Sequence, residues 1–330
     1  MPSGVELRVI FVAVGPGPVE PTVEGFLAAA GDRHDVTPYR AGDVISDQFE
    51  GLDAVVDFGG WASNELIDTG ADGGARLWQV LGYGLDQIDT GHVLQRGLLL
   101  AHTPGEVTAV PLAEHALFLI LSIEKKLHEG QRSLQSGVFY STMTGELAGK
   151  ALAIIGLGAS GRALARRAIE MEMRTLAIDV AEIPQSTLHE LQIAVCGGLE
   201  DLHQVLAQAD FVSIHTPLTS TTHHLIDGEA LRTMKPDAAL INVARGAIID
   251  ETALIAALQE GRIGGAGLDV FEREPLDPGH PLFDLDNVVL TPHIAGTTAG
   301  AARRRAMFAA ENIDRLAQGL PLEGQITTVW

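Results

Sequence analysis

A glycine-spaced turn between a strand and a helix constrains this chain more than any other feature. The apolar run Ala151–Ile155 leads directly into Gly156, Gly158 and Gly161, and a helical pattern follows. A strand that turns sharply into a helix needs glycine where the backbone bends, where a ligand comes close and where the helix packs on the strand. The first turn of such a helix also presents N–H groups to a phosphate. The spacing therefore predicts a βαβ unit that binds a dinucleotide.

An acidic residue follows the second apolar run of this unit. Asp179 comes directly after Thr175–Ile178, so its carboxylate is expected at the carboxyl end of a strand, where it can accept hydrogen bonds from ribose hydroxyls. No Arg or Lys lies between Asp179 and Leu188 to balance a 2′-phosphate. The pattern therefore favours NAD over NADP. The glycine hexapeptide alone is equally compatible with a turn that binds nothing.

The chain is long for a single hydrophobic core, so its 330 residues predict two domains. Apolar runs alternate with helix-compatible stretches, which is typical of parallel, doubly wound sheets. One long helix is expected over Ala113–Gln135, and a closing helix after about Ala299 would return to the first domain and make it discontinuous. The expected strands are Val9–Val14, Ala54–Phe58, Leu77–Leu81, Leu98–Ala101, Ala151–Ile155, Thr175–Ile178, Phe211–Ile214, Ala239–Asn242, Gly265–Asp269 and Val288–Leu290.

Charge and cysteine content exclude several classes of protein. The net charge of −21 argues against binding to a nucleic acid backbone. The apolar run Val9–Val14 is too short to span a membrane. The single cysteine, Cys196, cannot form an internal disulfide, which fits a cytoplasmic location, and its apolar surroundings predict a small core residue. The adjacent His223 and His224, with His215 nearby, do not match a zinc-ligand pattern, so no metal is expected.

Three ionisable residues lie just past expected strand ends and could perform hydride-transfer chemistry. His293, in LTPHIAG, can take up or release the hydroxyl proton near neutral pH. Glu274, in LDVFEREP, would orient the imidazole and stabilise its protonated form. Arg245, in INVARG, offers a planar fork for a substrate carboxylate. Each residue alone has a plainer interpretation, as a helix cap, a surface acid or a loop histidine, but their shared position at strand ends favours a catalytic site.

Several longer motifs resemble the D-isomer-specific 2-hydroxyacid dehydrogenases. The resemblance runs from about Leu77 to Ile294. It is carried by GYGLDQID (82–89), TPGEVTAVPLAEHA (103–116), GLGASGRALA (156–165), HTPLTSTTHHLI (215–226), MKPDAALINVARGAIIDETAL (234–254), GGAGLDVFEREPL (264–276) and NVVLTPHIAG (287–296). It implies an NAD-dependent oxidoreductase that interconverts a 2-oxo acid and its D-2-hydroxy acid.

This resemblance also implies an architecture and a set of site residues. A Rossmann NAD-binding domain, residues 103–298, would be inserted in a flavodoxin-like substrate domain, residues 1–102 and 299–330. A homodimer would form through the NAD-binding domains, with the helix near Ala113–Gln135 in the interface. Arg245, Glu274 and His293 would be catalytic, and the substrate carboxylate would bind Arg245 and the backbone N–H groups of Tyr83 and Gly84. The residues expected to contact the cofactor are Gly156, Gly158, Ala159, Ser160, Gly161, Asp179, Thr216, Val243, Ala244 and Asp269.

The chain departs from the family pattern at a few positions, and other functions stay open. Ser160 replaces an aliphatic residue and Glu172 replaces a glycine, which would affect cofactor affinity rather than catalysis. The loop FGGWASNEL, residues 58–66, lacks the arginine of the phosphoglycerate enzymes, and its Trp61 would either line the substrate site or pack between the domains. The alternatives are an NAD-sensing protein of the corepressor type, the hydroxypyruvate, glyoxylate or phosphoglycerate branch, and formate oxidation, for which an amide is expected where Glu274 stands.

Overall fold

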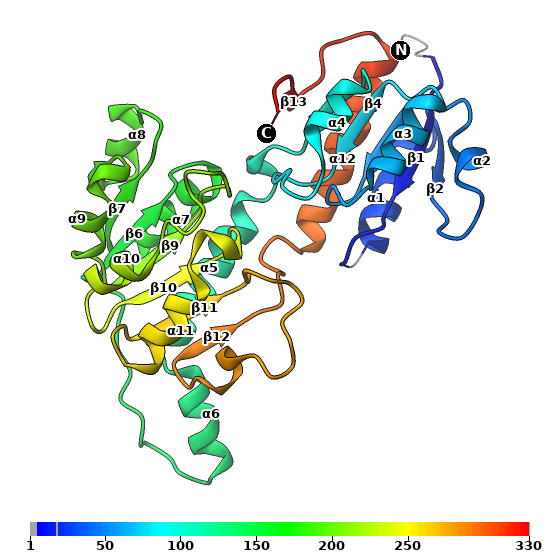
Figure 1. The fold of residues 1–330 in the computed structure, drawn as a ribbon. Coiled ribbons are helices and arrows are strands. Elements are labelled where there is room, and N and C mark those ends of the chain that lie inside the picture. The colour runs from blue at the N-terminus through cyan, green and yellow to red at the C-terminus, as the bar shows by residue number, and fades with distance from the viewer. Residues whose placement is uncertain (1–4, 18, 330) are drawn as a thin grey trace. The chain divides into compact units, whose positions relative to one another are not determined.

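The computed structural model describes residues 5–17 and 19–329. The chain divides into two compact units, Met1–Val107 with Thr297–Trp330 (unit one) and Thr108–Gly296 (unit two). Each unit is a sheet with helices on both faces (Figure 1). The division lies a few residues from the boundaries expected from the sequence. Val107 accepts a hydrogen bond from the Arg304 side chain of α12 (Ala299–Ala317), and Thr298 caps α12, so both junctions belong with that helix.

The described residues of unit one form a six-stranded sheet in the order β13-β5-β4-β3-β1-β2. Five strands are parallel, and β13 pairs antiparallel with β5. The parallel order 2-1-3-4-5 is that of flavodoxin-like sheets. The strands are β1 (Arg8–Val12), β2 (Asp35–Pro38), β3 (Ala54–Asp57), β4 (Leu77–Val80), β5 (Leu99–His102) and β13 (Gln325–Ile326).

Buried side chains fill both faces of this sheet. Phe26 and Ile313, from α1 and α12, pack on one face, and Ile67 and Val93, from α3 and α4, pack on the other. Trp78 in β4 is fully buried. The helices of unit one are α1 (Glu20–Ala30), α2 (Ile45–Phe49), α3 (Asn64–Asp72), α4 (Thr90–Gln95), η1 (Gly105–Val107) and α12.

The described residues of unit two form a seven-stranded parallel sheet in the order β12-β11-β10-β9-β6-β7-β8. Counted from β6, the order 3-2-1-4-5-6 is that of the Rossmann fold, with one more strand at the edge. The strands are β6 (Ala151–Ile155), β7 (Arg174–Ile178), β8 (Ile193–Gly197), β9 (Phe211–Ile214), β10 (Ala239–Asn242), β11 (Gly265–Leu268) and β12 (Val288–Leu290). The predicted fold class, two doubly wound parallel sheets, is confirmed.

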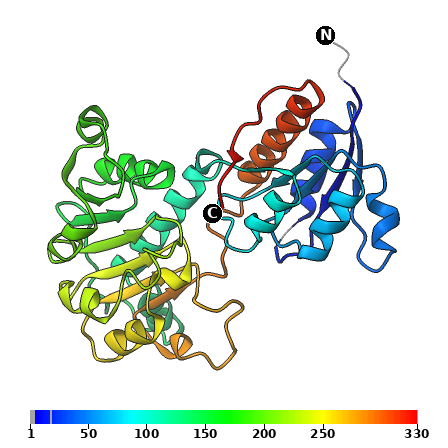
Figure 2. The same cartoon turned by 45° about the horizontal axis from the view of Figure 1, so that its top comes forward.

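Helices flank the sheet of unit two on both faces (Figure 2). Ile120 and Leu164 belong to the core on one face, and Leu231 and Leu258 to the core on the other. The helices are α5 (Ala109–Glu124), α6 (Leu127–Gln135), α7 (Ala159–Glu170), α8 (Gln185–Glu190), η2 (Leu199–Asp201), α9 (Leu202–Leu206), α10 (Gly228–Thr233), η3 (Gly246–Ile248), α11 (Glu251–Gln259) and η4 (Pro281–Asp284).

Two expectations drawn from the sequence are wrong. The single helix expected over 113–135 is two helices, because Lys126 adopts a left-handed backbone conformation (φ 48°) between α5 and α6. Cys196 is exposed rather than buried, since it lies on β8, the edge strand of its sheet. In the described part of the chain, no helix combines the length and apolar character needed to cross a membrane.

Candidate active site

The carboxyl ends of six neighbouring strands in unit two are aligned. Ile155 pairs with Ile178 and Ile214, and the register continues through Asn242 and Leu268 to Leu290. The residues that follow these positions therefore form one line along the sheet edge. In spatial order they are Thr291, Asp269, Val243, His215, Gly156 and Asp179. The order of the strands switches sides at β6: β7 and β8 follow on one side of it, and β9 to β12 follow on the other. Ligands of doubly wound sheets bind beside such a switch point.

The glycine turn has the geometry expected of a phosphate cradle. Gly156 has φ 98°, and a Cβ atom there would lie 2.8 Å from the backbone of His215 and Thr216. A Cβ atom at Gly161 would lie 2.1 Å from the carbonyl oxygen of Gly156. Gly158 is exposed and faces open space, and no side chain among the described residues caps the N-terminus of α7. The first N–H groups of α7 are thus available to an anion, so the turn fits the diphosphate of NAD.

Asp179 lies beside this turn at the end of β7. Its Oδ2 accepts a hydrogen bond from the N–H of Leu157 at 2.7 Å, and its Oδ1 accepts one from the N–H of Ala181 at 2.8 Å. A carboxylate has about four acceptor positions, so each oxygen keeps capacity for a ribose hydroxyl. The structure therefore brings Asp179 to the glycine turn in an orientation compatible with its expected role.

Other residues expected to contact NAD lie on the same edge. Ala159 and Ser160 form the first turn of α7, and Thr216 follows β9 next to Gly156. Val243 and Ala244 follow β10, where Val243 is buried and Ala244 is partly exposed. These positions agree with the expected cofactor path along the sheet edge, and their contacts with NAD stay a prediction.

His293 and Glu274 form a hydrogen-bonded pair at the β11 and β12 end of this edge. His293 Nδ1 lies 2.7 Å from Glu274 Oε2, and the His293 side chain is 47% exposed. Burial alone would raise the pKa of the Glu274 carboxyl. The hydrogen bond and charge of His293, the N–H of Phe271 and the charge of Arg245 outweigh burial and lower that pKa. Glu274 is thus an ionised carboxylate that orients the ring through Nδ1.

Arg245 is held by the end of β10. The fully buried Asn242 donates its side-chain N–H to the Arg245 carbonyl oxygen at 2.8 Å and accepts a hydrogen bond from the N–H of Ala244 at 3.0 Å. Gly246 packs so closely on Phe271 that a Cβ atom would lie 1.8 Å from the Phe271 carbonyl carbon. This contact brings the loop of Arg245 against the loop that carries Glu274. The structure therefore places all three predicted catalytic residues in one region of unit two.

Asp269 organises the loop that carries His293. Its buried carboxylate accepts hydrogen bonds from the Thr291 hydroxyl at 2.6 Å and from the N–H groups of Ile294 and Ala295 at 2.9 and 2.8 Å. The Asp269 carbonyl oxygen also accepts a hydrogen bond from the N–H of His293 at 2.7 Å. A contact between Asp269 and the cofactor stays a prediction, because the contacts described for its carboxylate are made within the protein.

Sequence reasoning missed residues that support this loop. His115 in α5 lies 2.8 Å from the Thr291 hydroxyl and 3.4 Å from Asp269 Oδ1. Burial raises the pKa of the Asp269 carboxyl, but hydrogen bonds from His115, Thr291 and the loop N–H groups outweigh it and lower that pKa. Asn242 was likewise missed. Both residues lie inside motifs quoted above, but nothing in their spacing indicates which loop they hold.

Tyr83 and Gly84 lie in unit one, after β4. The Tyr83 side chain is 43% exposed, and its carbonyl oxygen lies 2.8 Å from His102 Nδ1. The loop after β3 contacts this segment, since a Cβ atom at Gly82 would lie 3.9 Å from the Cα atom of Gly59. Both loops follow carboxyl strand ends, as a ligand site in such a sheet requires. Binding of a carboxylate by Tyr83 and Gly84 stays a prediction.

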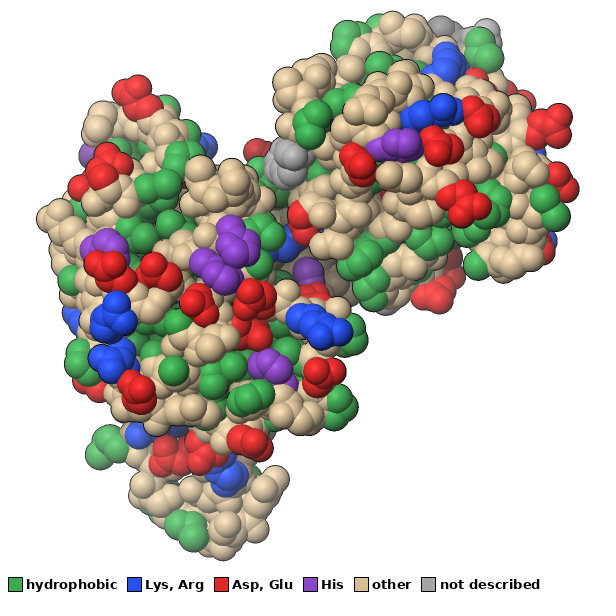
Figure 3. Space-filling model, in the orientation of Figure 1, with side chains coloured by type: hydrophobic (Ala, Val, Ile, Leu, Met, Phe, Trp, Pro, Cys, Tyr) green, Lys and Arg blue, Asp and Glu red, His purple; other side chains and the backbone are tan. Residues whose placement is uncertain are grey.

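The remaining charged clusters give no second candidate site. Across residues 5–17 and 19–329, no group of three His, Cys, Asp or Glu side chains is arranged to hold a metal ion. His223 stacks on His224, which pairs with Glu272 at 2.9 Å. On the face drawn in Figure 3, acidic and basic side chains are interspersed rather than gathered into a basic surface.

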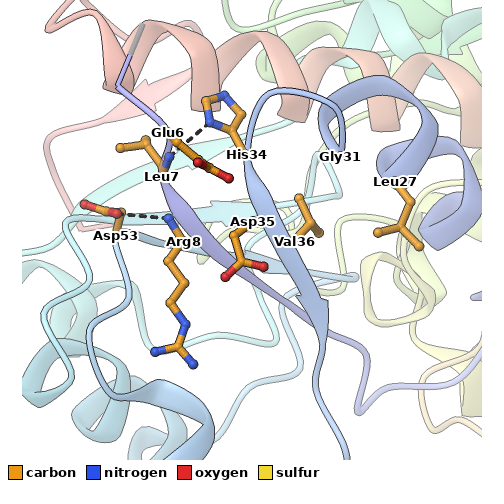
Figure 4. A pocket seen from close by; sticks show the side chains of 9 residues that line it. All are labelled: Glu6, Leu7, Arg8, Leu27, Gly31, His34, Asp35, Val36 and Asp53. Carbon is orange, nitrogen blue, oxygen red and sulfur yellow. Dashed lines mark hydrogen bonds between the residues drawn. The ribbon is translucent and has the colours of Figure 1, made fainter.

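A cavity of about 600 Å³ opens at the opposite end of the sheet in unit one (Figure 4). It is lined by residues that include Arg8, His34 and Asp53, near the amino ends of β1 and β2. Asp53 accepts a hydrogen bond from the N–H of Arg8 at 3.0 Å, and His34 Nδ1 accepts one from the N–H of Leu7 at 3.2 Å. Because ligands of such sheets bind at carboxyl ends, this cavity is not the candidate active site.

Comparison with known proteins agrees with the geometry of unit two. The family model "D-isomer specific 2-hydroxyacid dehydrogenase, NAD binding domain" matches residues 117–295. A glyoxylate reductase of Thermofilum pendens is 40% identical over 244 residues, which cover 72% of this chain and 70% of that protein. A D-3-phosphoglycerate dehydrogenase of Archaeoglobus fulgidus is 39% identical over 74% of this chain and 46% of its own length. The crystal structure of D-mandelate dehydrogenase from Rhodotorula graminis matches with a TM-score of 0.82 and 26% identity, over 99% of each chain.

Proposed function

The chain belongs to the family of D-isomer-specific 2-hydroxyacid dehydrogenases, and we propose that it uses NADH to reduce a small 2-oxo acid, with glyoxylate as the first candidate. The observation that carries this proposal is the 2.7 Å hydrogen bond between His293 and the ionised Glu274, beside Arg245. This acid–base pair lies on the same sheet edge as the glycine turn of the NAD-binding domain. The similarity to glyoxylate reductases supports the choice of acid.

The residues of the site suggest how protons and charges are handled. NADH, when bound, supplies the hydride that adds to the carbonyl carbon of the acid. His293 Nδ1 is held by Glu274, and Nε2 has no partner among the described residues, so Nε2 gives its proton to the carbonyl oxygen. The carboxylate of Glu274 stabilises the imidazolium that exists before this step. Arg245 binds the substrate carboxylate through its planar fork.

The first unit favours an acid without a phosphate group. Residues 58–66 contain no Lys or Arg, and the exposed ring of Trp61 lies against Gly15 and Gly59. A phosphorylated substrate would meet aromatic and backbone groups there instead of a cation. We therefore propose that the substrate is a small 2-oxo acid with an uncharged side chain. The phosphorylated acid of the phosphoglycerate dehydrogenases is disfavoured.

A substrate panel tests the proposal. NADH oxidation is measured with glyoxylate, hydroxypyruvate, pyruvate and a 3-phosphorylated 2-oxo acid, for the wild-type enzyme and for His293→Ala. We expect turnover of at least one small 2-oxo acid, and a loss of about a hundredfold or more in kcat for the variant. The His293 side chain is 47% exposed, so the variant should still fold, and thermal unfolding of both proteins checks this. Equal kcat in both proteins would refute the role of His293.

A pure NAD sensor of the corepressor type is the second candidate. The hydrogen-bonded His293 and Glu274 argue for catalysis, because a sensor has no need of an acid–base pair. Binding of NADH without turnover of any acid in the panel would favour the sensor. Formate-dependent formation of NADH would instead support the formate branch, in which an amide is expected at position 274.

We also propose that the protein is a cytoplasmic homodimer. Apolar side chains of α6 and the segment after it are exposed, including Leu134, Phe139, Tyr140 and Met143. This part of unit two extends away from its sheet (Figure 1). Exposed apolar groups of this kind are typical of an interface. Sedimentation equilibrium should show a dimer in the wild type and a shift toward monomer in Phe139→Asp, and a monomeric wild type would exclude the dimer.

A further inference from the structure

Ser160 occupies the second position of α7, where the sequence departs from its family, and its hydroxyl is part of a buried chain of hydrogen bonds. Ser160 Oγ lies 3.0 Å from His215 Nδ1, and His215 Nε2 lies 2.9 Å from Ser213 Oγ. Ser213 belongs to β9 and is fully buried, whereas Ser160 is partly exposed at the glycine turn. This series of hydrogen bonds therefore runs from the interior of the sheet to the site expected for the diphosphate.

Which group donates in each of these hydrogen bonds follows from the buried end of the series, at Ser213. His215 Nε2 is the partner described for the Ser213 hydroxyl, and a buried O–H without an acceptor is unfavourable by about 1 to 3 kcal/mol. Ser213 therefore donates to Nε2. Burial lowers the pKa of His215 to about 4, so the imidazole is neutral and carries its one proton on Nδ1. That N–H donates to Ser160 Oγ, and the hydroxyl proton of Ser160 remains available to another group.

We propose that Ser160, which is among the residues expected to contact the cofactor, does so by donating its hydroxyl proton to the diphosphate of NAD, with His215 and Ser213 as positioning residues. The hydroxyl lies in the first turn of α7, next to Gly158 and its open space. A helix N-terminus favours an anion at this place. The aliphatic residue of the family pattern could not make this bond. The inference rests on the NAD-binding domain and not on which acid is reduced.

Binding of cofactor fragments tests the proposed donor. Affinities for NADH, ADP-ribose and adenosine are measured by fluorescence and calorimetry for the wild type, Ser160→Ala and Ser160→Thr. A hydrogen bond to a charged group is worth about 10- to 100-fold in Kd. Ser160→Ala should therefore weaken NADH and ADP-ribose by that factor and leave adenosine, which has no diphosphate, unchanged. Ser160→Thr keeps the hydroxyl and should restore both affinities.

The control is Ser46→Ala, because Ser46 occupies the same second position in α2 of the other unit, and it should leave all affinities unchanged. If Ser160→Ala binds ADP-ribose as tightly as the wild type, the proposed donor is wrong. This outcome is distinct from failure of the proposed function, since an enzyme that reduces none of the 2-oxo acids would still show the expected change in ADP-ribose affinity.

The hydrogen positions are tested directly in the protein without cofactor. Nitrogen-15 NMR of the His215 ring should show a proton on Nδ1 and a bare Nε2 at neutral pH. Ser213→Ala removes the donor to Nε2, so the alternative form with a proton on Nε2 should appear, and NADH should bind more weakly than to the wild type. A wild-type ring protonated on Nε2, or a ring unchanged in Ser213→Ala, would overturn the proposed arrangement.

Discussion

At the scale of single residues, the planar fork of Arg245 has a role that a point charge cannot fill. Arg245→Lys keeps the positive charge near Glu274 but loses the paired donors that match a carboxylate. We expect kcat/KM for the 2-oxo acid to fall by roughly tenfold or more, because a charged hydrogen bond contributes about 1.5 to 3 kcal/mol. Steady-state kinetics at saturating NADH measure this effect. Wild-type KM and kcat in the variant would exclude the clamp.

Asp57 offers a test of buried charge at the end of β3. Its carboxyl is fully buried, accepts a hydrogen bond from Trp78 Nε1 at 3.1 Å, and has no partner for Oδ1 among the described residues. Burial raises the pKa of Asp57 to about 6. Because this pKa lies above that of the unfolded chain, the folded state loses stability as pH rises from about 4 through 6.

Asp57→Asn should therefore stabilise the protein at pH 8. The amide keeps an acceptor for Trp78 and carries no charge, so the free energy of unfolding should rise by roughly 1 to 3 kcal/mol at pH 8. The difference between the two proteins should nearly vanish at pH 4, where the wild-type carboxyl is protonated. Urea unfolding at both pH values measures it. A difference independent of pH would mean that the carboxyl is not the cause.

Individual residues differ in how far the sequence alone could assign them. Arg245, Glu274 and His293 follow strand ends within local motifs, so the geometry that brings them together was predictable from strand positions. His115 and Thr291 are 176 positions apart, and no local pattern shows that they meet. Asp269 was expected at the cofactor, but its carboxylate holds the loop of His293, which depends on contacts between three separate segments of the chain.

At the scale of elements, the strand–turn–helix at β6 and α7 separates the structural from the binding role of glycine. Gly161→Ala would place a Cβ atom 2.1 Å from a backbone oxygen, so the helix must shift. Gly158→Ala would face open space at φ −72°, which any residue adopts. We expect Gly161→Ala to lower the free energy of unfolding by about 2 kcal/mol or more, and Gly158→Ala to lower it by less than about 1 kcal/mol.

For Gly158→Ala, unlike Gly161→Ala, we expect the main effect on the affinity for NADH rather than on stability. Gly158→Ala adds a methyl group where the diphosphate approaches, so its Kd for NADH should rise although the protein stays folded. Thermal unfolding and NADH titration on the same samples provide the comparison. A Gly158→Ala protein that binds NADH as tightly as the wild type would show that the turn does not approach the diphosphate.

Buried strands were easier to predict than edge strands and helix breaks. The ten expected strands are mostly buried apolar runs, and all ten exist: four have the expected bounds, and six are shifted by one or two residues at an end. The strands β2, β8 and β13 were missed, and all three are edge strands of their sheets. β2 and β13 lack continuous apolar runs, whereas β8 has one but is not buried on either face. The break at Lys126 was missed as well, since a lysine gives no local signal for a left-handed conformation.

At the scale of the whole molecule, the two-unit organisation followed from chain length and from the alternation of strands and helices. The closing helix, α12, packs on α1 of unit one, and this unit is formed by two separate segments of the chain. The exact positions of the two junctions between the units could not be predicted from the sequence. At these junctions Arg304 donates a hydrogen bond to the Val107 carbonyl oxygen, although the whole of unit two lies between these residues in the sequence.

The preference for NADH over NADPH is best tested by measuring how each cofactor changes the thermal stability of the protein. A ligand that binds only the folded state stabilises it, by about 2.7 kcal/mol at a concentration 100 times Kd. NADH should therefore raise the thermal midpoint. NADPH at the same concentration should raise it far less, because its 2′-phosphate would lie against the carboxylate of Asp179 with no Arg or Lys between residues 179 and 188.

Asp179→Asn removes the repulsion but keeps an acceptor, so it should narrow the difference between the thermal midpoints measured with NADH and with NADPH. Equal shifts by NADH and NADPH in the wild type would show that Asp179 does not lie at the ribose, and the placement of the cofactor along the sheet edge would have to be revised.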